Sequence, residues 1–430
     1  MELQCRKLLY DVGMGYRTRV VDDRLAAVLT AMGGVVIEGA RGCGKTSTGL
    51  HHARSSVRLD ADPQAVALAD LDPRVVLAGA VPRLIDEWQL APNLWNVIRH
   101  EIDDRQAKGQ FILSGSATPP DDVRRHSGAG RLARLRMRPM SLAESGRSTA
   151  SVSLRWLGEA GMLSGIRSPL TYQDLADEAV RGGWPGLLGE PSAAGVEFNR
   201  SYLADLCSTD VPSATGTRHD PVRLRRLLES ASRNIATEAS LQSLAADVGG
   251  DGTPLDRSTV RAYLDALTTV FAVEELPAWS VALRSRTRLR SRPKLHLVEP
   301  SLACAALAIS PQRLARDPEF FGQIFEAMAI RDLRVYADAD QGQVFHYRDE
   351  SGLEVDAIVE YPGGMWGAVE VKLGASMISA AERSLLRLRD ERVDVTRTGP
   401  PSYLAVVTGT EYGYTLPSGV HVVPLATLGA

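Results

Sequence analysis

The first third of the chain alternates short apolar runs with segments of helical spacing. Apolar runs at 33–38 and 111–113, and a shorter one at 84–85, have the length of buried strands. Residues 1 to about 30 have the spacing of a helical lead-in. Strands that alternate with helices pack as a parallel sheet covered on both faces, so we expect an α/β fold in this region.

Helical spacing dominates the middle of the chain. Helical patterns near 224–228, 240–245 and 258–267 precede two extended runs at 270–276 and 294–298. The order helix, turn, helix and two strands resembles a winged helix. We therefore expect a helical middle region that contains a winged-helix segment.

A glycine-rich segment directly follows the first apolar run. Residues 39–46 read GARGCGKT and fit the phosphate-binding pattern G-x-x-x-x-G-K-[ST], between a strand and a helix-compatible run. Backbone N–H groups of such a loop converge on phosphate oxygens, Lys45 reaches the β- and γ-phosphates, and Thr46 ligates Mg²⁺. The residues expected to contact nucleotide are Gly39, Ala40, Arg41, Gly42, Cys43, Gly44, Lys45, Thr46, Ser47, Asp86, Ser114 and Ser116.

Two carboxylates end the second apolar run. Asp86 is placed to hold Mg²⁺ together with Thr46, and Glu87 to orient or deprotonate an attacking water. Ser114 and Ser116 end the next run, as γ-phosphate neighbours or as simple turn serines. The pair of carboxylates favours water over a small-molecule acceptor, so ATP hydrolysis with Mg²⁺ is expected rather than kinase activity.

The order of GARGCGKT, LIDEWQ, FILSGSA and GAGR resembles bacterial P-loop ATPases of the AAA class. More narrowly, it resembles the ATP-binding proteins of that class that carry a poorly characterised C-terminal region. The resemblance implies a homo-oligomer in which an arginine from a neighbouring subunit completes the site. Arg131 is the matching position, with Arg124 and Arg125 as alternates, and a plain surface arginine is the competing interpretation.

The last third of the chain combines acids with a lysine on three strand-like runs at 344–348, 353–359 and 365–372. Asp356 on one run and Glu370-x-Lys372 on the next resemble the PD-(D/E)xK nuclease core, a restriction-endonuclease-like α/β fold. That resemblance makes Glu326, Asp356 and Glu370 candidate Mg²⁺ ligands, with Lys372 assisting catalysis. The alternative is a fold retained without cleavage.

Local positive charge suggests DNA as a partner. The segment Arg284–Arg292 holds five arginines in nine residues, and strand alternation would place them on one side, toward a phosphate backbone. In a DNA-binding winged helix the recognition helix would begin with Arg257, Ser258, Thr259 and Arg261. The alternatives are a solvated loop and a winged helix used for protein contacts.

Bulk composition narrows these possibilities. The net charge of −3 gives no global footprint for nucleic acid, so any such surface must be local. The four cysteines lie far apart without a C-x-x-C pair, which suits a reducing compartment. The longest apolar run, 302–309, is too short to span a bilayer, and no apolar signal core is present, so we expect a cytoplasmic protein without membrane contact.

Two functions follow from the sequence. The first is an Mg²⁺-dependent ATPase that acts on DNA, and the second is a nucleotide-dependent switch whose partners are proteins and whose nuclease-like core is inactive. The expected domains are a P-loop ATPase domain (1–148), a helical connector (149–220), a winged-helix-like domain (221–300) and a nuclease-like domain (301–430).

Overall fold

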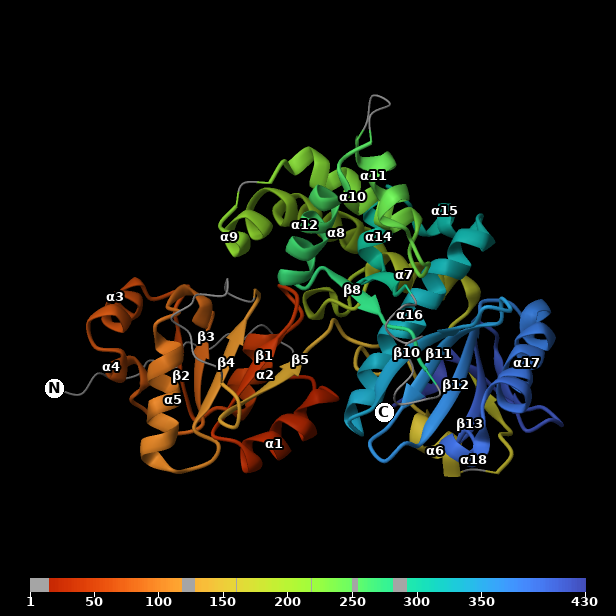
Figure 1. The fold of residues 1–430 in the computed structure, drawn as a ribbon, viewed down its shortest axis with the longest axis horizontal. Coiled ribbons are helices and arrows are strands. Elements are labelled where there is room, and N and C mark those ends of the chain that lie inside the picture. The colour runs from red at the N-terminus through yellow and green to blue at the C-terminus, as the bar shows by residue number, and fades with distance from the viewer. Residues whose placement is uncertain (1–14, 118–127, 160, 218, 250–253, 281–291) are drawn as a thin grey trace.

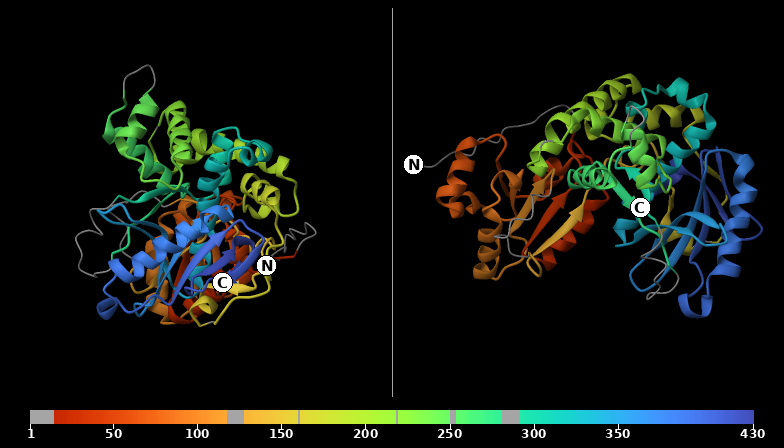
Figure 2. Two further views of the ribbon diagram at one scale, coloured as in Figure 1. Left: turned by 90° about the vertical axis from the view of Figure 1, so that its right-hand side faces the viewer. Right: turned by 45° about the horizontal axis from the view of Figure 1, so that its top comes forward.

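The computed structural model describes residues 15–117, 128–159, 161–217, 219–249, 254–280 and 292–430. The chain forms three parts: an N-terminal α/β part, a helical middle part and a C-terminal part built on a second sheet (Figure 1). A tilted view keeps the two sheets on opposite sides, with the middle helices over both (Figure 2). None of the helices in these ranges is long and apolar enough to cross a membrane.

The N-terminal part is a parallel sheet of five strands in the order β2-β3-β4-β1-β5, which confirms the predicted α/β fold. One face packs against α1 and the other against α3, α4 and α5, which explains why β4 is apolar and buried throughout. The strands are β1 (Gly34–Glu38), β2 (Ser55–Arg58), β3 (Arg83–Asp86), β4 (Phe111–Gly115) and β5 (Leu132–Arg136). The helices are α1 (Val21–Ala31), α2 (Lys45–His52), α3 (Pro63–Leu71), α4 (Pro73–Leu77), η1 (Trp88–Leu90) and α5 (Leu94–Arg105).

The middle part is a helical layer that ends in a two-stranded antiparallel hairpin of β8 and β9. Asp256 caps α12 by accepting a hydrogen bond from the Ser258 N–H. The helices and extended runs follow the predicted order, while the winged-helix assignment stays a prediction. The elements are α7 (Tyr172–Arg181), η2 (Pro185–Leu187), α8 (Ser192–Asp205), the π-helix η3 (Leu206–Asp210), α9 (Val211–Thr215), α10 (Pro221–Arg233), α11 (Leu241–Gly249), α12 (Arg257–Thr269), β8 (Val273–Leu276), β9 (Lys294–Leu297), α14 (Ser301–Ala306) and α15 (Pro311–Ala315).

The C-terminal part is a mixed sheet of seven strands in the order β10-β11-β12-β13-β15-β14-β7. Val369 and Val371 of β12 pack in the core that contains α16, whereas Ala368 packs in the core that contains α17. The two helices therefore cover opposite faces of the sheet. The elements are α16 (Pro318–Ala339), β10 (Gln343–Arg348), β11 (Glu354–Glu360), β12 (Trp366–Lys372), η4 (Ala375–Met377), α17 (Ile378–Arg387), the π-helix η5 (Leu388–Arg392), α18 (Val395–Thr398), β13 (Tyr403–Thr408), β14 (Tyr412–Thr415), β15 (His421–Pro424), η6 (Leu425–Thr427) and β16 (Leu428–Gly429).

The first part of the predicted helical connector belongs with the C-terminal sheet instead. β6 (Val152–Ser153) pairs in parallel with β16, and β7 (Ile166–Arg167) pairs with β14 at the sheet edge. The short helix α6 (Leu154–Glu159) lies between them in the chain. Strands of two residues carry no detectable alternation, so only pairing with distant segments reveals them.

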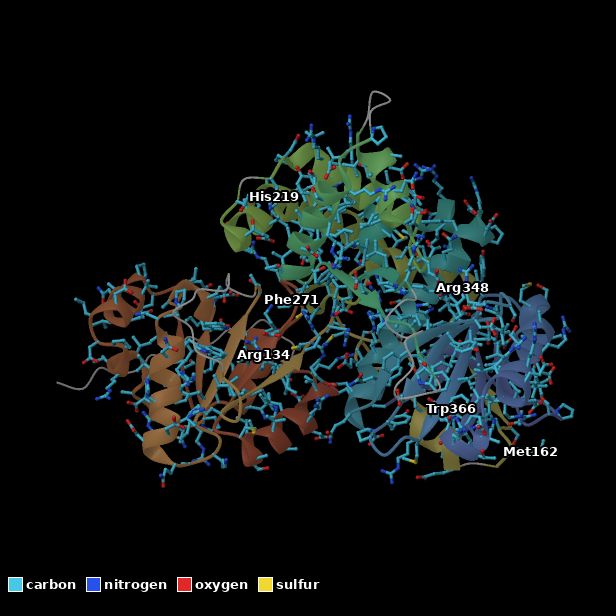
Figure 3. All side chains as sticks on the ribbon, in the orientation of Figure 1. Arg134, Met162, His219, Phe271, Arg348 and Trp366 are labelled. Carbon is cyan, nitrogen blue, oxygen red and sulfur yellow. The ribbon has the colours of Figure 1, made fainter. Side chains whose placement is uncertain are left out.

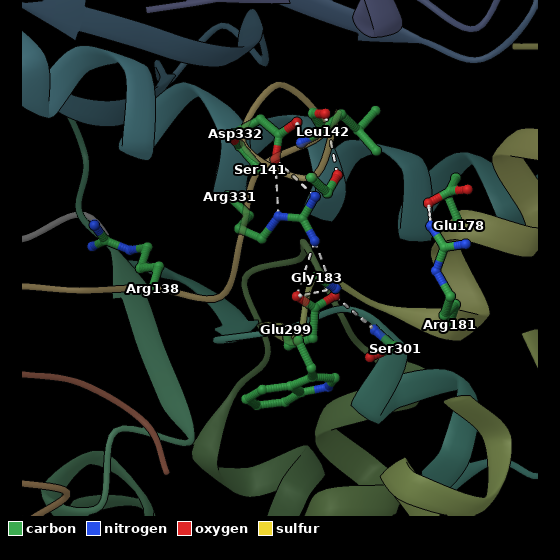
Figure 4. A network of polar contacts seen from close by, with 12 residues as sticks. Arg138, Ser141, Leu142, Glu178, Arg181, Gly183, Glu299, Ser301, Arg331 and Asp332 are labelled. Atoms are coloured by element: carbon green, nitrogen blue, oxygen red, sulfur yellow. Dashed lines mark hydrogen bonds and ion pairs between the residues drawn. The ribbon is translucent and has the colours of Figure 1, made fainter. Parts of the chain in front are cut away.

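A buried ion network joins the three parts (Figure 4). Arg331 of α16 contacts Glu299 Oε2 at 2.9 Å and Asp332 Oδ1 at 2.7 Å, and the three side chains are at most 4% exposed. Asp332 accepts the Leu142 N–H at 3.0 Å, and Glu299 accepts the Gly183 N–H at 3.2 Å. The network thus binds backbone from the N-terminal and middle parts to the first helix of the C-terminal part.

We expect Arg331→Met to lower the free energy of unfolding by about 3–5 kcal/mol, because two buried carboxylates would lose their partner. Urea denaturation measures the change. As a control, Arg397→Met removes an ion pair whose arginine side chain is 87% exposed, and it should cost less than about 1 kcal/mol. Equal losses in the two variants would contradict a dominant role for the buried network.

Candidate functional site

The glycine-rich loop lies between the end of β1 and the start of α2. Gly42 and Gly44 have φ angles of +77° and +103°, which only glycine adopts without strain. A Cβ at Gly39 would lie 2.0 Å from the Met137 carbonyl oxygen, so that position also requires glycine. The loop therefore directs its backbone toward the N-terminus of α2, a site suited to phosphate.

Lys45 is the first residue of α2, and its side chain folds back over the loop. Its Nζ donates hydrogen bonds to the carbonyl oxygens of Gly39 at 2.8 Å and Ala40 at 2.9 Å. The residue is buried, so the ammonium group is shielded from bulk water. A phosphate oxygen in the loop would compete directly for this ammonium group.

Thr46, Asp86 and Ser114 converge on one point beside the loop. Thr46 Oγ1 lies 3.0 Å from Asp86 Oδ1, and Ser114 Oγ donates to the same oxygen at 2.5 Å. The contact arises because β4 lies between β1 and β3, and Ser114, next to last in β4, is the direct strand partner of Asp86. Two hydroxyls and a carboxylate form the hard oxygen set that suits Mg²⁺.

Burial raises the pKa of Asp86, and the neighbouring charge of Glu87 raises it further. Hydrogen bonds from Ser114 and Thr46 act in the opposite direction, because they stabilise the ionised carboxylate. The two hydroxyls thus help to keep Asp86 in the form that binds a cation.

Glu87 follows Asp86 in a left-handed conformation with φ +54°, which is unusual for a residue other than glycine. Its Oε2 accepts hydrogen bonds from Ser116 Oγ at 3.3 Å and from the Gln89 side-chain amide. The sequence indicated Glu87 and Ser116 but missed Gln89. Together these contacts hold the carboxylate beside the Asp86 cluster.

Arg131 lies at the amino ends of the sheet strands, whereas the glycine-rich loop lies at their carboxyl ends. Its carbonyl oxygen accepts the N–H of Gly34, the first residue of β1, whereas the loop follows the last residue of that strand. Its guanidinium pairs with Asp103 at 2.7 Å. The structure therefore does not place Arg131 in the nucleotide loop of its own chain, and the alternates Arg124 and Arg125 lie outside the described residues.

The middle part packs directly on the loop. Arg41 Nη1 forms an ion pair with Asp210 Oδ1 at 2.9 Å, at the end of the π-helix η3. A Cβ at Gly42 would lie 3.8 Å from the Trp184 ring, and that ring packs at a tilt of 34° against Tyr202, with the ring centroids 4.8 Å apart. The sequence did not indicate that Asp210 and Trp184 lie next to the loop, because no motif or spacing around either residue connects it to that site.

A second contact joins the carboxyl end of β5 to the β8–β9 hairpin and the residues just before it. In Figure 3 the labels of Arg134, on β5, and Phe271, just before β8, mark the two segments that meet. Arg136 lies over the Phe271 ring at 4.0 Å. Glu274 of β8 accepts Arg138 at 3.0 Å and Arg334 at 2.7 Å. Burial opposes ionisation of Glu274, yet the arginines hold its pKa at about 2, so the interface keeps its charge at neutral pH.

The predicted acids and lysine of the C-terminal part lie together. Lys372 Nζ contacts Glu370 Oε2 at 2.6 Å and Asp356 Oδ2 at 2.8 Å, and the Val371 N–H donates to that Asp356 oxygen at 2.8 Å. Glu326 of α16 joins them through another lysine, Lys294. The ordered set thus meets in space, as strand adjacency predicts.

Lys294 of β9 was missed because it belongs to the middle part. Its Nζ lies 2.9 Å from Glu326, 2.8 Å from Glu354 and 3.8 Å from Asp356. Among the described residues no group of three or more His, Cys, Asp or Glu side chains is arranged to hold a metal ion. The predicted ligands Glu326, Asp356 and Glu370 are joined by ammonium groups instead.

Charge crowding is evident in the pKa values of this carboxylate cluster. Burial and the nearby Asp356 raise the pKa of Glu326 to about 7, and burial with the same neighbour raises that of Glu370 well above its ordinary value. Although burial opposes it, Lys372 and Lys294 lower the pKa of Asp356. Of these three acids, Asp356 is therefore the most firmly ionised.

A cavity of about 510 Å³ opens between α11, the start of α12 and the hairpin. Arg257, Arg261 and Arg292 line it. Arg261 contacts Asp265 at 3.0 Å and Glu275 at 3.5 Å, so part of its charge is balanced locally. Ser258 and Thr259 lie beside Arg257 on α12, while residues 284–291 of the arginine segment lie outside the described residues.

Comparison with known proteins divides the chain into three matched regions. Residues 33–146 match the model of an AAA domain. Residues 172–313 and 321–428 match two domains of unknown function, DUF8612 and DUF4143. The AAA match covers the loop, Asp86, Glu87 and Ser114. It supports an AAA-class P-loop ATPase domain that binds ATP.

Uncharacterized proteins of Mycobacterium bovis and Mycobacterium tuberculosis are each 27% identical to the chain over 403 residues, which is 91% of this chain and 79% of theirs. A Walker-type ATPase of Pyrococcus abyssi aligns over 68% of this chain and 96% of its own, at 10% identity and a TM-score of 0.41. AMPPCP-bound DnaA of Aquifex aeolicus aligns over 59% of this chain and 89% of its own, at 14% identity and a TM-score of 0.24.

We expect Ser114→Ala to make Mg²⁺-dependent nucleotide binding more sensitive to acid. Loss of the hydrogen bond raises the Asp86 pKa further, so the ionised carboxylate is lost at a higher pH as the pH falls. Affinity at mildly acidic pH should drop on the order of 10-fold, with little change at alkaline pH. A pH series of labelled-ATP anisotropy measures this. Ser116→Ala, which touches Glu87 instead, is the control, and identical pH profiles for both variants would refute the role of Ser114.

Proposed function

We propose that the protein is an Mg²⁺-dependent ATPase that acts on DNA. The observation that carries the ATPase proposal is the convergence of Lys45, Thr46, Asp86 and Ser114 at one edge of a parallel sheet, beside Glu87. The AAA match over the same residues supports it. Phosphoryl transfer to water requires these parts: a cationic cradle, a metal site and a positioned carboxylate.

Each side chain has a role that its present contacts make available. Lys45 would exchange the loop carbonyls for phosphate oxygens, and Thr46 with Asp86 would hold Mg²⁺, which neutralises charge on the phosphates. Ser114 would keep Asp86 ionised at the γ-phosphate side of the site. Glu87 would orient the attacking water and accept its proton.

We also propose that the protein works as a homo-oligomer. Arg131 lies at the end of the sheet opposite the loop, on the surface, so as an arginine finger it would serve the site of a neighbouring copy rather than that of its own chain. Its partner Asp103 would release it when the neighbour's nucleotide presents a stronger anion. An arginine supplied by another subunit stabilises charge that develops during hydrolysis.

Lys45→Ala should weaken ATP binding by at least about 30-fold, because the phosphate charge loses its buried cation. Glu87→Gln should bind ATP normally but hydrolyse it about 100-fold or more slowly. Isothermal titration and phosphate release measure the two effects, and Lys108→Ala, an exposed lysine of the same part, is the control. Normal turnover by Glu87→Gln would mean that another group positions the water.

The proposed contacts with DNA involve the middle and C-terminal parts of the chain. The three arginines around the cavity beside α12 provide phosphate contacts on the predicted recognition helix and hairpin. The element order α16, β10, β11, β12, α17 and β13, with acids and Lys372 on β11 and β12, supports a nuclease-like core. We propose that this core holds or cuts the DNA that the middle part grips.

DNA affinity should fall steeply with salt, and Arg257→Ala and Arg261→Ala should each reduce the slope of log K against log salt by about one. Fluorescence anisotropy with duplex DNA at several salt concentrations measures the slope. Arg397→Ala, an exposed arginine on α18, should leave it unchanged. Binding that is absent, or equal slopes in all variants, would refute DNA contact at this cavity.

A specific contact favours the alternative of a nucleotide-dependent switch with protein partners. The loop itself touches the middle part through Arg41–Asp210 and the Trp184 ring, so a nucleotide in the loop would act on those helices directly. In that case the middle part would bind a protein, and the nuclease-like core would be inactive. ATP turnover that is indifferent to DNA would favour this alternative.

A further inference from the structure

Lys294 is the one basic side chain that the middle part contributes to the described carboxylate cluster of Glu326, Glu354, Asp356 and Glu370. Its side chain is 3% exposed, and its ammonium group touches acids from α16 and β11. It therefore occupies the centre that Glu326 and Asp356 would otherwise share. A lysine placed in this way offsets the repulsion between the carboxylates, as a bound metal cation would.

The cluster contains more acids than bases. Four carboxyl groups face two ammonium groups, those of Lys294 and Lys372. The Glu354 side chain is 39% exposed and that of Lys372 is 23% exposed, so one side of the cluster opens to solvent. A divalent cation that entered there would pair with the acids in excess, but Lys294 occupies the position between Glu326 and Asp356.

The strand that carries Lys294 is one half of the β8–β9 hairpin, and its Leu295 also pairs with Thr237 after α10. β9 pairs with β8, and the chain that leaves β8 is joined to β10 of the C-terminal sheet. There the His346 N–H donates to the Pro277 carbonyl at 3.0 Å, and the Trp279 N–H donates to the His346 carbonyl at 2.6 Å. The hairpin that borders the arginine-lined cavity is thus the element that presents Lys294 to the acids.

We propose that Lys294 is an internal cation that keeps the carboxylate cluster closed, so that the cluster binds a divalent cation only when the β8–β9 hairpin withdraws it. While Lys294 lies among the acids, the residues do not fit a metal bound between Glu326 and Asp356. Contact of a ligand with the hairpin would thereby control whether the cluster is loaded. The inference rests on the proposed nuclease-like role only for the use made of the cation, not for its binding.

The test is Mn²⁺ titration by calorimetry without nucleotide, which measures binding rather than cleavage. We compare the wild type, Lys294→Met and Lys294→Met with Asp356→Asn. Lys294→Met should bind Mn²⁺ on the order of 10-fold or more tightly than the wild type, and Asp356→Asn should remove the gain. Thermal melting and ATP binding verify that each variant is folded.

Folded Lys294→Met that binds Mn²⁺ no more tightly than the wild type would overturn the proposal. If that variant misfolds, Lys294→Gln keeps a hydrogen-bond donor without the charge and should show the same gain. A comparison of Mn²⁺ binding by the wild type and by the single variant Asp356→Asn tests the proposal independently. Tight Mn²⁺ binding that Asp356→Asn abolishes, with Lys294 in place, would show that the lysine does not close the cluster. If the wild type shows no such Asp356-dependent Mn²⁺ binding, the result would support the proposal that Lys294 keeps the cluster closed. Failure of DNA cleavage or ATP hydrolysis would bear on the proposed function alone.

Discussion

The arrangement of the three parts depends on one buried guanidinium, that of Arg331. Burying charges is costly, and the cost is recovered only when every group finds a partner. Here Glu299 and Asp332 neutralise Arg331, and their remaining capacity binds the N–H groups of Gly183 and Leu142. One network therefore fixes a segment of the middle part and the end of the N-terminal part against α16. Gly183 directly precedes Trp184, so the same network helps to place the ring that lies beside Gly42 of the nucleotide loop.

This placement makes the phosphate-binding loop part of an interface between structural regions. Ala40 shares a hydrophobic core with residues of the middle part, and Arg41 is paired with Asp210. A change in the loop must therefore be accommodated by α8 and the π-helix that follows it, since packed interiors shift as units rather than deform smoothly. A DNA-acting ATPase and a protein-directed switch would both use that link. They differ in whether the middle part passes the change to DNA or to a protein.

The two acid clusters show how neighbouring groups decide what a carboxylate can do. Asp86 accepts hydrogen bonds from the hydroxyls of Thr46 and Ser114. Its cationic partner Arg58 lies 3.6 Å away, with a side chain that is 36% exposed. Asp356 instead lies between Lys372 and Lys294, which neutralise it. Under the proposals made above, the first cluster would hold Mg²⁺ as it stands, whereas the second would first require movement of a lysine that another part of the chain supplies.

The sequence by itself determined the parallel sheet, the loop at 39–46 with Asp86 and Glu87, and the meeting of Asp356, Glu370 and Lys372. These features are local: alternation marks the strands, and consecutive strands place their ends side by side. Only the tertiary structure decided that Asp210 pairs with Arg41 and Trp184 lies beside Gly42, that β7 joins the C-terminal sheet, and that Lys294 lies among the acids. It also placed Arg131 at the end of the sheet opposite the loop. Contacts between segments distant in the chain leave no period or spacing in the sequence, because packing and charge pairing in three dimensions select them.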